Sequence, residues 1–153
     1  HRMPFIVRWP GRVKAGTVTD QTICFTDLLA TFAEIGGQPL PAGAGPDSFS
    51  ILPVLEDRQA KNQPIRGPIV MQAGNFSTLS IRSGDWKLID HLGSGGFSKP
   101  AQIEAKPGGP KGQLYNLRED PSETNNLYLE NPEIVTRLDT EMKRIEVSGH
   151  SRY

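Results

Sequence analysis

Apolar side chains recur at helical spacing between positions 25 and 35, separated by polar or small residues. Thr22 or Thr26 can supply the N-cap of a helix there, and the pair Gly36-Gly37 can end it. The pattern predicts an amphipathic helix. Its apolar stripe consists of Phe25, Leu28, Leu29, Phe32 and Ile35.

A second helical pattern lies near the end of the chain. Asn131 followed by Pro132 is typical of a helix start, with Asn as the cap and Pro in the first turn. We expect this helix to cover one face of a sheet. Its apolar stripe consists of Ile134, Leu138, Met142 and Ile145.

Other segments have the patterns of strands. Residues 4–9 form an apolar run closed by Pro10-Gly11, which predicts a buried strand that leaves its sheet through a turn. Such a strand needs neighbouring strands on both sides. A β-hairpin signature follows, with an apolar run at 68–72, alternation at 77–82, a turn at 83–85 and a second run at 86–89. Residues 113–117 predict one more strand.

The segments between these elements divide the chain. Residues 38–46 are rich in Pro, Gly and Ala, residues 50–55 can form one helical turn, and a polar stretch leads to residue 64. We therefore expect a domain boundary after residue 64, which separates region 1–64 from region 65–153. Residues 93–112 contain repeated Gly and three Pro, which predicts a long surface loop.

Composition and charge narrow the classes of protein. A hydrophobic fraction of 36% with 16 Gly and 13 Pro favours short elements joined by loops over a helix bundle. Lys and Arg number 17, as do Asp and Glu, and no basic cluster fits a run of phosphates, which argues against a nucleic-acid partner. No apolar run approaches the roughly 20 residues of a membrane span. The first residue is His, a strand-like segment follows at once, and we expect a truncated chain.

Three separated strings resemble the sulfatase family, the formylglycine-dependent hydrolases of the alkaline-phosphatase superfamily. Residues 1–11 read HRMPFIVRWPG and are similar to the family's Gly-x-Arg-x-Pro-x-Ile-x-x-Trp-Pro-Gly strand, with DLLAT at 27–31 resembling the helix that follows. Residues 80–89, SIRSGDWKLI, resemble the Arg-x-Gly-x-Trp-Lys-Leu-Ile hairpin. Residues 113–127, QLYNLREDPSETNNL, resemble the Leu-Tyr-Asp-Leu-x-x-Asp-Pro-x-Glu stretch near the family's C-terminus. The strings occur in the family's order, which makes a chance match improbable.

The resemblance implies an α/β protein, which as this C-terminal portion alone is α+β. Residues 1–64 would supply a late strand and a helix of the large sulfatase sheet domain. Residues 65–153 would form a small antiparallel sheet subdomain packed with a C-terminal helix. The implied partners are the N-terminal catalytic half of the same protein and a sulfated small molecule or glycan. Family members are often exported, although the residues themselves leave the compartment open.

The implied chemistry needs residues that this sequence lacks. Family members use a formylglycine, made from Cys in a Cys-x-Pro-Ser-Arg string, and a calcium or magnesium ion held by Asp-rich segments. Cys24, the one cysteine, is followed by Phe25-Thr26-Asp27, which does not match, and a half-buried structural thiol is the better interpretation. We therefore expect no catalytic, cofactor-binding or metal-binding residue here, and an isolated chain without activity.

Three residues are candidates for contact with a substrate in a whole enzyme. The resemblance places His1 and Arg2 in a loop that follows the family's catalytic Lys, although a structural or disordered terminus explains them as well. His91 follows the hairpin beside the Gly-rich loop, where a solvated histidine is the simpler interpretation. Three bases at positions 8, 12 and 14 could favour an anionic ligand, but exposed bases usually line a solvated edge.

Two other functions stay open on the sequence alone. The hairpin, the following strand and the last helix look like a complete unit, which would suit an independent binding or interaction module. Superfamily relatives also hydrolyse phosphate esters or phosphonates on a similar scaffold, and fold does not choose between these reactions. The loop at 93–112 could contribute to substrate choice in any of these enzymes.

Overall fold

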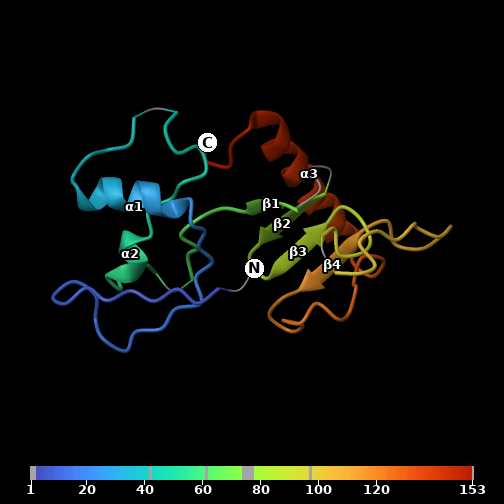
Figure 1. The fold of residues 1–153 in the computed structure, drawn as a ribbon, viewed down its shortest axis with the longest axis horizontal. Coiled ribbons are helices and arrows are strands. Elements are labelled where there is room, and N and C mark those ends of the chain that lie inside the picture. Colours follow the sequence, from blue (N-terminus) through green and yellow to red (C-terminus); the bar gives the residue numbers. More distant parts are fainter. Residues whose placement is uncertain (1–2, 42, 61, 74–77, 97, 153) are drawn as a thin grey trace. The chain divides into compact units, whose positions relative to one another are not determined.

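The computed structural model describes residues 3–41, 43–60, 62–73, 78–96 and 98–152, and it divides the chain into two units. Unit 1 comprises His1–Gly67 together with Arg152–Tyr153, and unit 2 comprises Pro68–Ser151. In Figure 1, unit 1 holds the helices α1 (Asp27–Ile35) and α2 (Leu52–Leu55). Unit 2 holds four strands and the helix α3 (Pro132–Ser148).

The predicted first helix is confirmed as α1, with Gly36 at its end. Thr26, one of the two predicted caps, stands at the N-cap position. Its backbone angles are helical, and its side chain makes no cap bond. The Thr26 hydroxyl instead donates to the carbonyl oxygen of Asp47, at 3.3 Å. The predicted helical turn at 50–55 is confirmed as α2.

The face that α1 buries differs from the predicted one. Asp27, Ala30 and Thr31 are the buried residues of α1. Phe25, just before the helix, and Phe32 within it are 59% and 63% exposed. The apolar stripe therefore faces away from unit 1, because polar anchors described below hold the opposite side of the helix.

The prediction of a buried strand at residues 4–9 is wrong for this structure. These residues form no strand, and Ile6 is 90% exposed. An isolated strand leaves its backbone groups unpaired, and the described part of unit 1 offers it no strand partner. The turn after the segment does form, since the amides of Arg12 and Val13 both donate to the carbonyl oxygen of Trp9.

Unit 2 is built on a four-stranded antiparallel sheet in the order β1-β2-β3-β4. The strands are β1 (Ile69–Gln72), β2 (Leu79–Ser83), β3 (Trp86–Ile89) and β4 (Gln113–Asn116). The register places Ile81, Leu88 and Leu114 side by side on one face. This arrangement confirms the predicted hairpin and the further strand, and it makes the chain α+β.

The core of unit 2 lies between this face of the sheet and α3, which packs on β2 and β3 (Figure 1). Three residues of the predicted stripe, Leu138, Met142 and Ile145, are buried in it, and Ile134 packs at its edge. As predicted, Asn131 occupies the N-cap position and Pro132 lies in the first turn, but the Asn131 side chain makes no cap bond. Its amide group lies instead 3.4 Å from the carbonyl oxygen of Leu127.

The other face of the sheet carries a buried amine. Lys87 is 7% exposed, and its Nζ donates to both carboxylate oxygens of Glu123, at 2.9 and 2.7 Å. Glu123 lies in the segment that follows β4, and its φ of 57° is in the left-handed region. The ion pair therefore ties this irregular segment to β3.

Asp120 anchors the same segment. Its carboxylate accepts bonds from the amides of Thr124 and Asn125, at 2.7 and 2.8 Å, and from the Thr124 hydroxyl. The Asn125 amide is the main cause that lowers the pKa of Asp120 below its usual value, and the Thr124 groups add to it. The segment that begins with Asp-Pro-Ser-Glu thus forms a turn stabilised by its first side chain, as Asp commonly does in turns.

We predict that this turn loosens in acid. Because the folded-state pKa is lowered, the stabilisation is complete above the unfolded pKa of roughly 3.9 and is lost as pH falls through the folded value. Denaturant unfolding should therefore show Asp120→Asn less stable than wild type by a constant amount above about pH 5, and the gap should close in stronger acid. A gap that widens on acidification would contradict this assignment.

Candidate functional site

The carboxylate of Asp27, fully buried in unit 1, joins three segments of chain. It accepts the amide of Cys24 at 2.7 Å, the amide of Phe49 at 3.0 Å and Nη1 of Arg66 at 2.7 Å. The Arg66 side chain is 3% exposed, and its guanidinium lies 5.0 Å from the centre of the Phe49 ring. A buried charge is tolerated when it is paired and hydrogen-bonded in this way.

Two hydroxyl groups complete the anchoring of α1. The Ser48 hydroxyl accepts the Ala30 amide at 2.8 Å, which satisfies a donor in the first turn of the helix. The Thr31 hydroxyl donates to the Asp27 carbonyl and accepts the Ile51 amide at 3.0 Å. These polar groups hold α1 against residues 48–51. Their hydrogen bonds therefore serve the fold and not a reaction.

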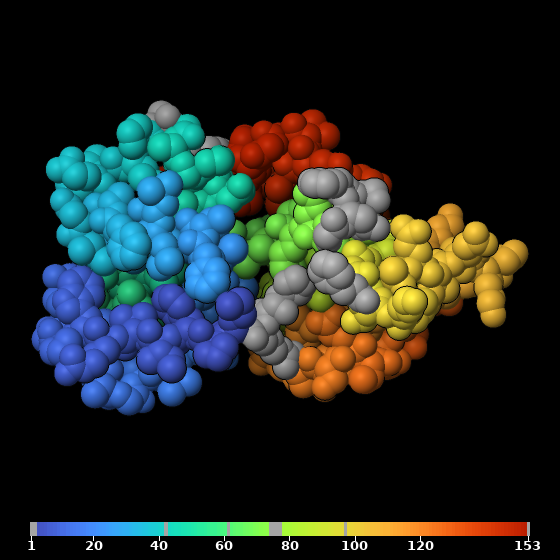
Figure 2. Space-filling model, in the orientation of Figure 1, coloured from blue at the N-terminus to red at the C-terminus, as the bar shows by residue number. Residues whose placement is uncertain are grey.

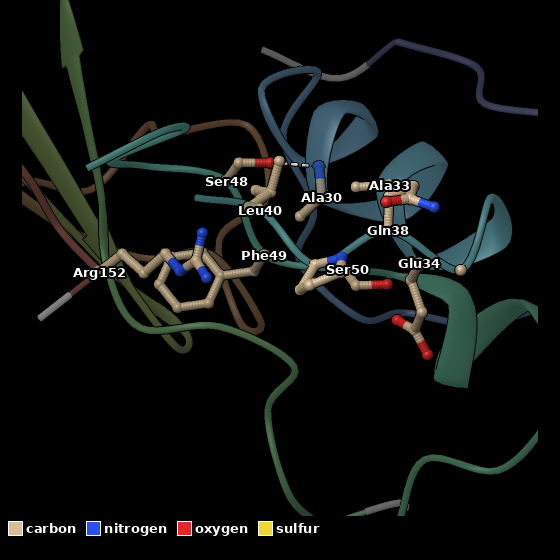
Figure 3. Close-up of a pocket in the computed structure, with 11 residues that line it drawn as sticks. Ala30, Ala33, Glu34, Gln38, Leu40, Ser48, Phe49, Ser50 and Arg152 are labelled. Atoms are coloured by element: carbon tan, nitrogen blue, oxygen red, sulfur yellow. Dashed lines mark hydrogen bonds between the residues drawn. The ribbon is translucent and has the colours of Figure 1, made fainter. Parts of the chain in front are cut away.

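A pocket of about 480 Å³ lies beside this anchor within unit 1 (Figure 3). It is lined by part of α1, the turn that follows it, residues 48–50 and Arg152. The hydroxyl of Ser48 points to the Ala30 amide, as the dashed line in Figure 3 shows. Among the described residues that line the pocket, Glu34 is the one carboxylate, and neither His nor Cys occurs. These lining residues therefore provide no paired acid and base, and no nucleophile held beside a general base.

His91 lies where β3 leads into the Gly-rich loop of unit 2. Its Nδ1 is 3.2 Å from Oδ1 of Asp90, whose carboxylate also accepts the Leu79 amide. Nε2 is buried and has no partner among the described residues. A Cβ added to Gly95 would lie 2.6 Å from Nε2, so the loop backbone closes over the ring. In this conformation the His91 ring supports the loop.

Gln113 fastens the base of that loop. Its side-chain amide donates to the carbonyl oxygens of His91 and Gly93, at 3.0 and 2.8 Å. Its own carbonyl oxygen accepts the Tyr115 hydroxyl, at 2.7 Å. Leu92 and Ile103 form an isolated bridge further along, and residues 98–108 are exposed. The loop is thus held at its base by Gln113, and within it the amides of Ser94 and Gly95 donate to the carbonyl oxygens of Pro100 and Ala101.

The structure accounts for the other predicted residues in different ways. His1 and Arg2 lie outside the described residues. Cys24 is half-buried, as expected for a structural thiol. The ion pair of Asp27 and Arg66 was not predicted, because the partners are 39 positions apart and no local pattern marks them.

The bases near the start of the chain are partly committed to internal contacts. Nε of Arg12 lies 2.7 Å from Oε1 of Glu56, and its guanidinium lies over the ring of Trp9. Hydrogen bonds from Arg12 first, and then from Arg58, lower the pKa of Glu56. Arg12 is therefore less suited to an anionic ligand than the sequence suggested, because it already has an anionic partner.

The described residues contain no group of three or more His, Cys, Asp and Glu side chains that could hold a metal ion. The carboxylates have structural partners instead, such as Arg118 for Asp85. Across the same residues, no helix is long and apolar enough to cross a membrane.

Comparison with known sequences gives relatives that are named as sulfatases. The chain is 39% identical over 140 residues to an N-acetylgalactosamine-6-O-sulfatase of Bacteroides thetaiotaomicron, across 90% of this chain and 26% of the relative. It is 30% identical to an ulvan-active sulfatase of Formosa agariphila, across 82% and 28%. It is 28% identical to arylsulfatase K of Rattus norvegicus, across 94% and 24%. The chain thus spans about a quarter of each relative, and no family model matches it.

Solved structures agree on the fold. One, from work on the metabolism of multiple glycosaminoglycans by Bacteroides thetaiotaomicron, superposes with a TM-score of 0.60 at 34% identity, over 79% of this chain and 24% of that one. Another, a complex with its substrate D-glucosamine-2-N,6-O-disulfate, gives a TM-score of 0.66 over 92% and 27%. At 21% identity the second match concerns the fold alone.

Proposed function

Because the chain belongs to the sulfatase family, we propose that it is the C-terminal part of an enzyme that hydrolyses sulfate esters. The observation that carries the proposal is the 39% identity to the N-acetylgalactosamine-6-O-sulfatase over 90% of the chain. The fold agrees, since unit 2 is a small antiparallel sheet with a C-terminal helix. A sulfated glycan is the substrate class that the names of the bacterial relatives suggest.

The proposal assigns the reacting groups to the part of the enzyme outside this chain. A formylglycine nucleophile and a calcium or magnesium ion are the groups expected for the family. The described residues do not fit the ion, because they contain no suitable cluster of ligands. The groups that could have served are occupied, as Asp27 is by Arg66. The role proposed for this chain is structural support and a contribution to the substrate pocket, without activity of its own.

Activity assays can test the proposal directly. The quarter of the Bacteroides N-acetylgalactosamine-6-O-sulfatase that matches this chain would be replaced by the chain itself. We expect the chimaera to release sulfate from the relative's substrate, and the 153-residue chain alone to release none. A folded chimaera without activity would refute the proposal, and release of phosphate in place of sulfate from matched esters would favour the phosphoesterase alternative.

We further propose His91 as a contact for substrate, together with His1 and Arg2 at the start of the chain. For His91 this requires the loop at Gly95 to move, since Nε2 is buried under it. The Gly-rich loop of residues 93–112 would then contribute to substrate choice.

In the active chimaera, His91→Ala should raise KM and lower kcat/KM about threefold to tenfold. This is the change expected from the loss of one hydrogen bond to substrate. Glu130→Ala, an exposed change in unit 2 outside this loop, is the control. Steady-state kinetics and thermal denaturation would be measured together. Unchanged kinetics with a lower melting temperature would show that His91 only supports the loop.

One observation favours the alternative of an independent binding module. Unit 2 has its own closed core between the sheet and α3. The exposed apolar residues of unit 1 weigh against this alternative for the chain as a whole. If the chimaera fails and the 153-residue chain is monomeric and stable, the module becomes the better proposal.

A further inference from the structure

Large apolar side chains are exposed mainly in unit 1. The exposed ones there are Met3, Phe5, Ile6, Val18, Phe25, Leu29, Phe32 and Ile35, against Ile103, Leu129 and Val147 in unit 2. The segment that includes α1, light blue in Figure 2, lies open on the face shown. Single exposed apolar residues are ordinary, but a group of them marks a surface that another molecule covers.

Four of these residues form one stripe, which we call the α1 apolar face: Phe25, Leu29, Phe32 and Ile35. They are 59%, 52%, 63% and 40% exposed. Within α1, positions 29 and 32 are three residues apart and share one side of the helix, and Phe25 lies just before its first turn. The buried residues Asp27, Ala30 and Thr31 lie on the opposite side.

The orientation of α1 is set by specific bonds. Asp27 is tied to Arg66 and to two backbone amides, and the Ala30 amide is tied to Ser48. Turning the helix to bury its apolar side would break the buried ion pair and leave charges unpaired, which costs several kcal/mol. The apolar face is therefore held outward by the fold.

We propose that the α1 apolar face docks against the remaining three quarters of a sulfatase, the part of the relatives that this chain does not match. This inference rests on the proposed function and names the surface through which it acts. A second feature of unit 1 calls for a partner as well. Residues 4–9 have the pattern of a buried strand, yet Phe5 and Ile6 are exposed and no described strand pairs with them. Strands supplied by the larger part would pair with residues 4–9.

A second copy of the chain is a poorer occupant. Taking about 200 Å² for a full side chain, the four residues expose roughly 400 Å². A stable interface buries about 800 Å² on each partner. The α1 apolar face alone is therefore too small for a stable dimer of the chain.

Co-purification tests the proposal. The part of the Bacteroides sulfatase outside the matched quarter would carry an affinity tag and be co-expressed with the 153-residue chain. We expect the two to co-purify in about equal amounts, and Leu29→Asp or Phe32→Asp to lower the retained chain at least tenfold. Val147→Asp, an equally drastic change at an 89% exposed position of unit 2, should leave retention unchanged. Amide exchange at Cys24 and Ala30 would verify that α1 stays anchored in each variant.

Each contrary result has a distinct meaning. Failure of the wild-type chain to co-purify, or equal retention of all variants, would overturn the docking proposal. Sedimentation of the chain alone showing a dimer that Phe32→Asp dissociates would assign the face to a second copy and also overturn it. Co-purification that depends on Leu29 and Phe32 but gives an inactive complex would uphold docking and count against the sulfatase function. An active complex whose formation is insensitive to both substitutions would support the sulfatase function and count against docking through the α1 apolar face.

Discussion

Replacing Arg66 with Met should destabilise unit 1 by about 3–5 kcal/mol, the usual cost of removing one partner of a buried ion pair. The Asp27 carboxylate is fully buried and would keep only its two amide donors. Its charge would have no compensating cation, because Arg66 is the cation that pairs with it. The loss should be confined to unit 1, since both partners and the segments they join belong to it.

The positions of the two tryptophans make the loss of stability in unit 1 measurable separately from that of unit 2. Trp9 lies in unit 1 and Trp86 in unit 2, so denaturant unfolding in a Trp86→Phe background reports unit 1 through Trp9 fluorescence. Arg8→Met, the same change at an exposed position, is the matched control and should cost less than about 0.5 kcal/mol. The double variant Asp27→Asn with Arg66→Met should recover part of the loss by removing the stranded charge. A loss below about 1 kcal/mol in the single variant would mean that the pair is not what holds α1.

Leu138→Ala should have the second large effect, in unit 2. Leu138 is fully buried between α3 and the sheet, where truncating a leucine costs about 2–5 kcal/mol in lost burial and cavity formation. Val147→Ala on the same helix, at 89% exposure, should change stability by less than about 0.5 kcal/mol. Here Trp86 is the reporter, because it packs against the same core.

The outcome for Leu138→Ala also separates the two units. If they unfold independently, Trp86 fluorescence should shift to lower denaturant while Trp9 fluorescence does not. A shift of both signals together would show that unit 1 depends on unit 2 for its stability, and the prediction of a confined effect would be wrong.

The elements of unit 2 were predictable because their stabilising partners lie within the unit. The stripe of Leu138, Met142 and Ile145 meets Ile81 and Leu88 of the hairpin, so the pattern in the sequence and the burial in the structure coincide. Local pattern was sufficient there. The cap of α3 was not predictable in detail, because the Asn131 side chain turns back toward Leu127 and leaves the helix amides.

Unit 1 shows where the same reasoning stops. The helix α1 was predictable from its apolar spacing, but the side that it buries was not. Asp27 faces inward because Arg66 neutralises it, and nothing in a local pattern links positions 27 and 66. The prediction of a buried strand at 4–9 failed for a related reason, since a strand forms only where another strand pairs with it.

The candidate site was predictable only in outline. The sulfatase resemblance of the three strings is confirmed by relatives and by the fold. His91 could be nominated from its place in the sequence, but its packing under Gly95 could not, because it depends on the path of a loop without regular structure. His1 and Arg2 stay predictions.

Gln113 makes two bonds to carbonyl groups at the base of the 93–112 loop. Because these bonds fix the ends of the loop, the segment between them can be exchanged for another sequence. The register of β3 and β4 is set by the ladder and by this one side chain, and the exposed stretch at 98–108 adds nothing to it. Segments of other lengths could be grafted between the anchored ends without disturbing the sheet. New variants could therefore be selected at this loop while the scaffold beneath it stays unchanged.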